Sequence, residues 1–128
     1  MQVLNTYDYA VIRVVPRVDR GEFVNVGVLI SSAKLGVLKC RIEMSEDKVR
    51  ALAADVDLEP IRAILEAIPK ICAGGAAAGD LGKLSRGERF HWLVAPRSSS
   101  VQMSPVHMGR AQDIDSALEQ IFKKMVAG

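Results

Sequence analysis

Two polar segments of the chain carry most of the residue types that could do chemistry. The first runs from Arg13 to Asn25, and the second runs from Arg97 to His107. Guanidinium, hydroxyl and backbone amide groups together suit a phosphate or carboxylate ligand. We therefore predict that the two segments, if they meet in the fold, line one anion-binding cleft. Its predicted members are Arg13, Arg20, Glu22, Asn25, Arg97, Ser98, Ser99, Ser100 and His107.

A plainer interpretation of these residues stays open. The arginines of the first segment can be surface ion-pair partners of Asp19 and Glu22, and the serines of the second segment can be turn residues. His107 can be a hydrogen-bonded structural residue. The residue types alone do not decide between a binding cleft and a solvated surface.

No catalytic motif organises these side chains. The run Ser98 to Ser100, together with His107 and Asp113, contains the residue types of a hydrolytic triad. No G-x-S-x-G elbow frames any of the serines, and a triad is defined by geometry, which the order of residues does not supply. Glu22 is the one strong candidate for an acid or base beside the anion site.

The histidines and cysteines show no metal-ligand spacing. The chain has two of each, His91 and His107 and Cys40 and Cys72, and none of them forms a closely spaced pair. We expect no metal and no cofactor. We expect the cysteines to be reduced, mostly buried thiols, and a Cys40–Cys72 bridge remains an alternative.

Composition bounds the class of protein. The chain has 128 residues, about half of them apolar and a quarter charged, which is typical of one globular domain with a real core. A net charge of +2 creates no strong field for nucleic acid, and aromatic residues for base stacking are few, at 5%. Both observations argue against nucleic-acid binding.

The chain also lacks the usual signals for membranes and export. No apolar run approaches the roughly 20 residues that span a bilayer. The first residues lack the basic flank and apolar stretch of a signal peptide. We expect a cytoplasmic protein without membrane contact.

The first third of the chain predicts three antiparallel strands. Residues 7–15 and 23–30 are apolar on both parities, which is typical of interior strands covered on both faces, and residues 16–22 turn the chain between them. Gly27 inside the second strand indicates a bulge or a close backbone approach. Residues 37–43 alternate cleanly between apolar and polar, so this strand should lie nearer an edge. Short connections predict a meander.

The remainder predicts helices around one more strand. Ser45 and Asp57 have the position of helix N-caps, Pro69 should end or kink the second helix, and Gly74 and Gly75 should stop it. The expected elements are helices at 45–55 and from 57, a mobile glycine-rich loop at 74–87, a strand at 89–95, a short strand within 97–110 and a helix at 113–125.

These elements predict an α+β fold in a single domain over residues 1–128. We expect a two-layer sandwich, in which a mostly antiparallel sheet of about four to five strands carries three helices on one face. Antiparallel edge strands leave a homodimer through sheet extension open.

Two stretches of the chain resemble a known family. The motif from Tyr9 to Pro16 and from Arg20 to Val28, with RGEFVNVGV in its second half, resembles the bacterial domain-of-unknown-function family numbered 3037. The segment from Phe90 to Gly109 resembles the same family's C-terminal signature, although Met103 and Met108 stand where polar residues such as Thr are expected. The resemblance implies a small bacterial cytosolic protein, encoded beside or fused to a kinase-like protein of the HipA type.

Three functions are compatible with the sequence. The first is a non-enzymatic binding or partner module that acts with a HipA-like kinase in a toxin–antitoxin, stress or defence setting. The second is an enzyme of phosphate chemistry, a nuclease or phosphotransferase, that uses the arginines, Glu22 and His107. The third is nucleic-acid binding through arginines, against which the low net charge argues.

Overall fold

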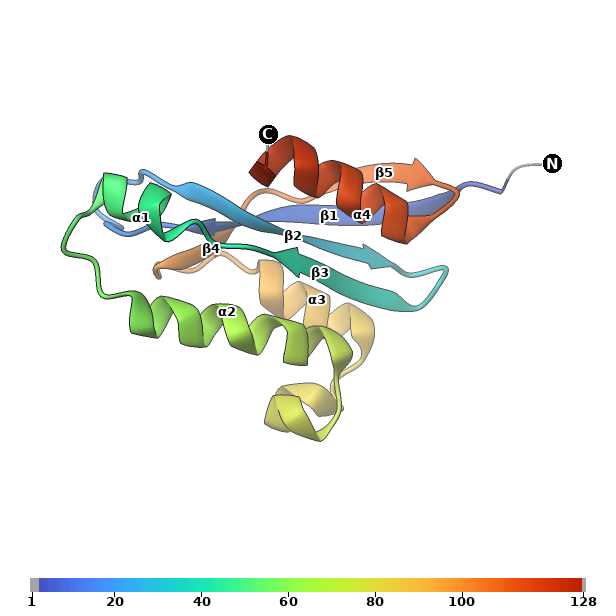
Figure 1. The fold of residues 1–128 in the computed structure, drawn as a ribbon. Coiled ribbons are helices and arrows are strands. Elements are labelled where there is room, and N and C mark those ends of the chain that lie inside the picture. Colours follow the sequence, from blue (N-terminus) through green and yellow to red (C-terminus); the bar gives the residue numbers. More distant parts are fainter. Residues whose placement is uncertain (1–2, 128) are drawn as a thin grey trace.

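The computed structural model describes residues 3–127, and these residues form one five-stranded antiparallel sheet with helices on both faces (Figure 1). Strands β1 to β3 form the expected meander, in the order β3-β2-β1. Two short strands then pair one after the other with the far edge of β1, the first with residues 12–14 and the second with residues 5–9. The strands are β1 (Asn5–Val14), β2 (Val24–Ser32), β3 (Val37–Ile42), β4 (Val101–Met103) and β5 (His107–Ala111).

The helices begin where the sequence places caps. Ser45 and Asp57 cap the first two α-helices, and Asp113 caps the last α-helix. Acidic residues occupy the first turn of each of these helices, where the helix dipole favours them. The helical segments are α1 (Glu46–Leu52), α2 (Leu58–Ala73), the 3₁₀ segment η1 (Ala76–Lys83), α3 (Arg86–Val94), α4 (Ile114–Phe122) and the π-helical turn η2 (Lys123–Ala127).

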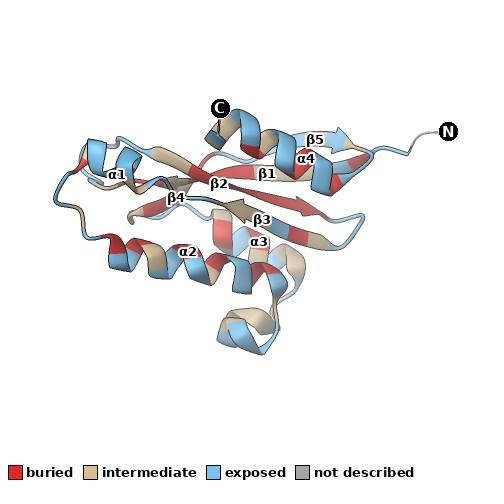
Figure 2. Cartoon of the chain, viewed as in Figure 1, coloured by how far each residue is buried: buried red, intermediate tan, exposed pale blue. Residues whose placement is uncertain are grey.

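The α+β class and the mostly antiparallel sheet are confirmed, whereas the layering differs from the expectation. Helices α2 and α3 cover one face of the sheet, and α4 covers the opposite face. The buried side chains accordingly lie along β1 and β2 and on the sheet-facing sides of α2 and α4 (Figure 2). The physical reason was present in the sequence, because strands that are apolar on both parities need cover on both faces.

The expected strand at 89–95 is wrong, because these residues lie in α3. The alternation of Phe90, Trp92 and Val94 has the period of a strand, but Phe90 and Leu93 are the buried pair, at helical spacing. Ser85 and Glu88 form a reciprocal capping box, in which each side chain accepts a hydrogen bond from the other residue's backbone N–H. That local signal fixes the start of a helix.

Helix α2 continues through Pro69 to Ala73, so Pro69 does not end it. Gly74 then caps the helix, as expected, with a positive φ of 74°. The glycine-rich stretch after it forms the short turns of η1 rather than an extended loop.

Both interpretations of Gly27 are confirmed. The pairing of β1 with β2 shifts between Ile12 and Arg13, where Ile12 faces Gly27 and Arg13 faces Asn25. A Cβ added at Gly27 would lie 2.7 Å from the carbonyl oxygen of Arg41 on β3. The bulge allows Asn25 and Val28 both to face α4, although regular alternation would send them to opposite faces.

Within residues 3–127, no helix has the length and apolar character needed to cross a bilayer.

Candidate functional site

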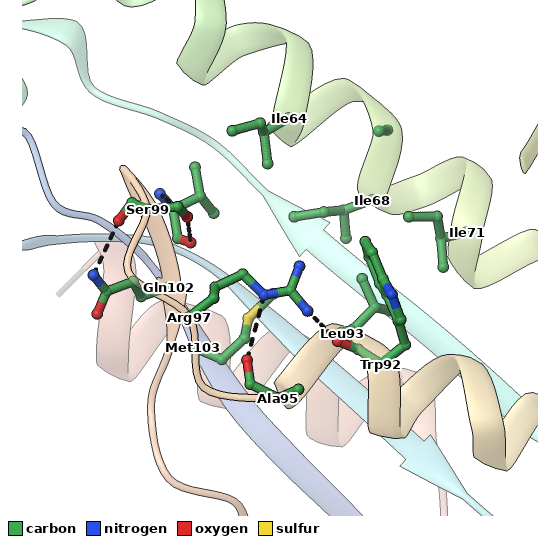
Figure 3. A pocket seen from close by; sticks show the side chains of 12 residues that line it. Ile64, Ile68, Ile71, Trp92, Leu93, Ala95, Arg97, Ser99, Gln102 and Met103 are labelled. Atoms are coloured by element: carbon green, nitrogen blue, oxygen red, sulfur yellow. Dashed lines mark hydrogen bonds between the residues drawn. The ribbon is translucent and has the colours of Figure 1, made fainter. Parts of the chain in front are cut away.

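An apolar groove lies where α2, α3 and β4 meet (Figure 3). Its volume is about 310 Å³, which is at the lower end for small-molecule and side-chain pockets. It is lined by Ile64, Ala67, Ile68, Ile71, Trp92, Leu93, Ala95, Arg97, Ser99, Val101, Gln102 and Met103. We call it the α2–α3 groove.

One wall of the α2–α3 groove is the isoleucine stripe of α2. Ile64, Ile68 and Ile71 follow each other at intervals of four and three residues, so they lie on one side of the helix. Ile68 and Ile71 are buried against the sheet, whereas Ile64 keeps 40% of its surface exposed. The stripe therefore extends past the core and leaves apolar surface open to solvent.

The opposite wall comes from α3 and β4. Leu93 is buried, and Trp92, its neighbour at the end of α3, is 41% exposed. Val101 and Met103 of β4 complete the floor. A half-exposed Trp and a half-exposed Ile on opposite walls of one groove form the kind of surface that buries further area on binding.

Arg97 supplies the polar group on the rim. Its guanidinium carbon lies 4.4 Å from the centre of the Trp92 ring, and its N–H groups donate to the carbonyls of Trp92 and Ala95 (Figure 3). These bonds satisfy carbonyls left open at the C-terminal end of α3. Arg97 thus holds the indole in place and presents a positive charge beside an apolar cavity.

Of the predicted serines, one belongs to this groove. The Ser99 hydroxyl donates to the carbonyl of Val101 at 2.6 Å and accepts from its N–H, which makes the bend into β4. Ser98 is exposed outside the lining. Ser100 borders a separate hollow near Arg17.

Arg13 and Asn25 are neighbours across the β1–β2 pair, but they face α4 rather than the groove. The guanidinium carbon of Arg13 lies 4.1 Å from the centre of the Phe23 ring. Asn25 donates from its amide nitrogen to the carbonyl of Met125 at 3.0 Å, which ties η2 to the sheet. Arg13 Nε and Asn25 Oδ1 are buried without a hydrogen-bond partner within residues 3–127.

The remaining predicted residues lie elsewhere. Arg20 and Glu22 form an exposed ion pair, with 2.8 Å between Nε and Oε1. The ring of His107 packs on that of Tyr9, with centroids 5.3 Å apart. The two polar segments do meet at one point, because Arg13 of β1 pairs with Gln102 of β4, whereas His107 pairs with Tyr9, which precedes the first segment. The predicted side chains nevertheless do not line one cleft.

The residue types of a triad are also not assembled. The Asp113 carboxylate accepts hydrogen bonds from the N–H of Asp115 and the hydroxyl of Ser116, and these bonds hold the pKa of Asp113 below its usual value. His107 contacts Tyr9 rather than a serine or an aspartate. Within residues 3–127, no cluster of three His, Cys, Asp or Glu side chains has an arrangement that could hold a metal ion.

The apolar residues of the groove were missed at the sequence level, whereas Arg97 and Ser99 were among the predicted site residues. The expected strand at 89–95 separates Trp92 and Leu93 from α2. The capping box at Ser85 and Glu88 could have shown that Trp92 lies in a helix, which must pack on an apolar surface.

The comparison with protein families covers almost the whole chain. Residues 9–126 match the family described as protein of unknown function (DUF3037). The chain belongs to the DUF3037 family. No curated protein and no solved structure matches it. As the resemblance predicts, the RGEFVNVGV stretch and the segment around Arg97 both fall inside the matched region.

Proposed function

We propose that this DUF3037 protein is a non-catalytic binding module that takes an apolar side chain of a protein partner into the α2–α3 groove. The observation that carries the proposal is the open isoleucine stripe of α2 facing a half-exposed Trp92, with the Arg97 guanidinium on the rim. An aromatic or branched aliphatic side chain fits a cavity of about 310 Å³. A neighbouring acidic group or phosphate on the partner would pair with Arg97.

We propose a HipA-like kinase, which the family resemblance implies as a partner, as the first protein to test. Binding energy at such a site concentrates in a few apolar anchors, so the effect of substitutions should be large in the groove and small elsewhere. The phosphate-chemistry alternative needs Glu22, arginines and His107 around one anion. Their separate positions give that alternative no support.

The test measures the affinity of the purified kinase for variants of this chain. Ile64→Glu places a charge in the groove at a position that is already 40% exposed, so the fold should survive. We expect binding to weaken by about tenfold or more, since loss of an anchor costs more than ~1.4 kcal/mol. Arg97→Ala should weaken binding as well.

Two controls accompany these variants. Leu35→Glu introduces the same charge at a comparably exposed residue in the turn between β2 and β3, and Glu22→Ala removes an exposed charge from the other polar segment. Both should bind as the wild type does. Equal affinity for Ile64→Glu and Leu35→Glu would refute the groove as the binding site. If the wild-type chain does not bind the kinase, the kinase is excluded as the partner.

A further inference from the structure

The two cysteines lie side by side where α2 crosses β3. Cys40 of β3 points to the α2 face of the sheet, as do Leu38 and Ile42, and Cys72 lies in the last turn of α2. Both side chains border one shallow hollow beside Pro69 and Lys39. Both thiols are free, and both side chains pack in the core between the sheet and α2.

The position of Cys72 is fixed by a second contact. The Nη1 group of Arg89 on α3 donates to the carbonyls of both Ile71 and Cys72 at 2.7 Å, and its Nε donates to the carbonyl of Leu84. This arginine satisfies carbonyls at the C-terminal end of α2 and ties the backbone of Cys72 to α3. Packed elements that present two thiols to each other provide the approach that a disulfide needs.

The two thiols differ in environment. Cys40 is partly exposed in the hollow, whereas Cys72 is buried. The hydrogen bond from the Cys72 thiol lowers the pKa of Cys40, and the same contact together with burial raises the pKa of Cys72. Because the thiolate is the reactive form, Cys40 is the nucleophile of the pair, and Cys72 is the second thiol that lies within its reach.

We propose that Cys40 and Cys72 form a site of reversible oxidation by hydroperoxides, which closes a disulfide between β3 and α2. The Cys40 thiolate attacks a peroxide oxygen and breaks the O–O bond, which yields a Cys40 sulfenic acid and releases hydroxide or alkoxide. Cys72 gives its proton to the released base, attacks the sulfenic sulfur and expels hydroxide. In sum, two thiols lose two protons and two electrons, and the peroxide is reduced to water or to water and an alcohol.

The experiment treats the reduced full-length chain with stoichiometric hydrogen peroxide and measures its intact mass. We expect the wild type to lose two hydrogens and all free thiol while it stays monomeric in denaturing gels, and dithiothreitol should restore the starting mass. Cys72→Ser should stop at the sulfenic acid of Cys40, trapped as a dimedone adduct. Cys40→Ser should react much more slowly with dimedone.

A second measurement keeps the test independent of the variants. In the native wild type, a brief pulse of peroxide with dimedone followed by peptide mapping should label Cys40 ahead of Cys72. In the denatured chain the preference should disappear, since it comes from the fold. Equal labelling in the native state, disulfides between chains, or sulfinic acid without a disulfide would each overturn the proposal.

Discussion

At Ser104, a side-chain hydroxyl replaces a backbone acceptor in the sheet. The N–H of Val11 donates to Ser104 Oγ at 2.8 Å, and the N–H of Ser104 donates back to the carbonyl of Val11 at 2.9 Å. Both residues are buried. This exchange bridges the gap between β4 and β5, so the edge of β1 stays paired although the second polar segment bends there.

Ser104→Ala should therefore destabilise the protein. It leaves the buried N–H of Val11 without an acceptor, and an unsatisfied buried group costs about 1–3 kcal/mol. Ser98→Ala is the matched control, because Ser98 is exposed, and its effect should stay within about 0.5 kcal/mol. Urea unfolding followed by circular dichroism measures both. Equal midpoints for the two variants would contradict this role of Ser104.

At the residue scale, the sequence predicted which positions carry polar side chains better than it predicted where those side chains point. Arg13 and Asn25 were recognised as polar candidates, and a bulge or close backbone approach at Gly27 was expected. The partners of these side chains were not readable, because Phe23 and Met125 reach them only through the turn before β2 and the last turn of the chain. For that reason the predicted cleft divides between the α4 face, an exposed loop and the α2–α3 groove.

At the scale of elements, two glycines should respond oppositely to the same change. Gly27→Ala forces a Cβ to within 2.7 Å of a backbone oxygen of β3, and since a backbone atom does not move aside freely, we expect a loss of about 1–3 kcal/mol. Gly87→Ala in α3 meets no atom within 4 Å and should add about 0.5–1 kcal/mol through helix propensity. Thermal and urea unfolding of the two variants would give the signs, and a stabilising Gly27→Ala would refute the close approach.

The capping box of α3 should make stability depend on pH. Hydrogen bonds from the backbone and then the side chain of Ser85 hold the pKa of Glu88 below its ordinary value. A lowered pKa in the folded state means that the ionised form adds stability above the unfolded pKa of about 4.3, and that this contribution disappears as pH falls through the folded value. Glu88→Gln should thus be less stable than the wild type at pH 7, and the two should converge in acid.

Unfolding midpoints of both chains across this pH range measure the effect. Glu66→Gln removes an exposed carboxylate from α2 and serves as the control. Its unfolding midpoint should differ from that of the wild type by the same amount at every pH. A difference between wild type and Glu88→Gln that is the same at all pH values would show that the charge of Glu88 does not act in the cap.

The error at α3 shows where local patterns stop being sufficient. In residues 89–95, Phe90, Trp92 and Val94 alternate as in a strand, while Phe90 and Leu93 have the spacing of a helix. The apolar pattern alone therefore fits a strand or a helix. The meander, the caps at Ser45 and Asp57 and the end of α2 at Gly74 were predictable, because each has a local cause. Which helix covers which face of the sheet depends on contacts between distant segments, which no local pattern contains.

For the whole molecule, the two edges of the sheet are protected differently. Lys39 and Arg41 on the β3 edge pair with Asp115 and Glu119 of α4, so that edge is charged and partly covered. The β5 edge has one exposed charge, Arg110, and carries Met108, which is 73% exposed. Charged side chains discourage the addition of another strand, and exposed apolar ones favour it.

We therefore expect self-association through β5, with a second copy adding antiparallel to this strand. Light scattering during size exclusion over a range of concentrations should show a wild-type mass that rises toward a dimer, and Met108→Lys should keep the chain monomeric because it places a charge on the pairing edge. Leu35→Lys, at a residue that is 47% exposed in the turn between β2 and β3, should associate as the wild type does. A wild type that stays monomeric at every concentration, or a Met108→Lys chain that still dimerises, would exclude the β5 edge as the interface. The contrast between the two lysine variants separates an effect of position from an effect of added charge, because both carry the same new charge on an exposed apolar site.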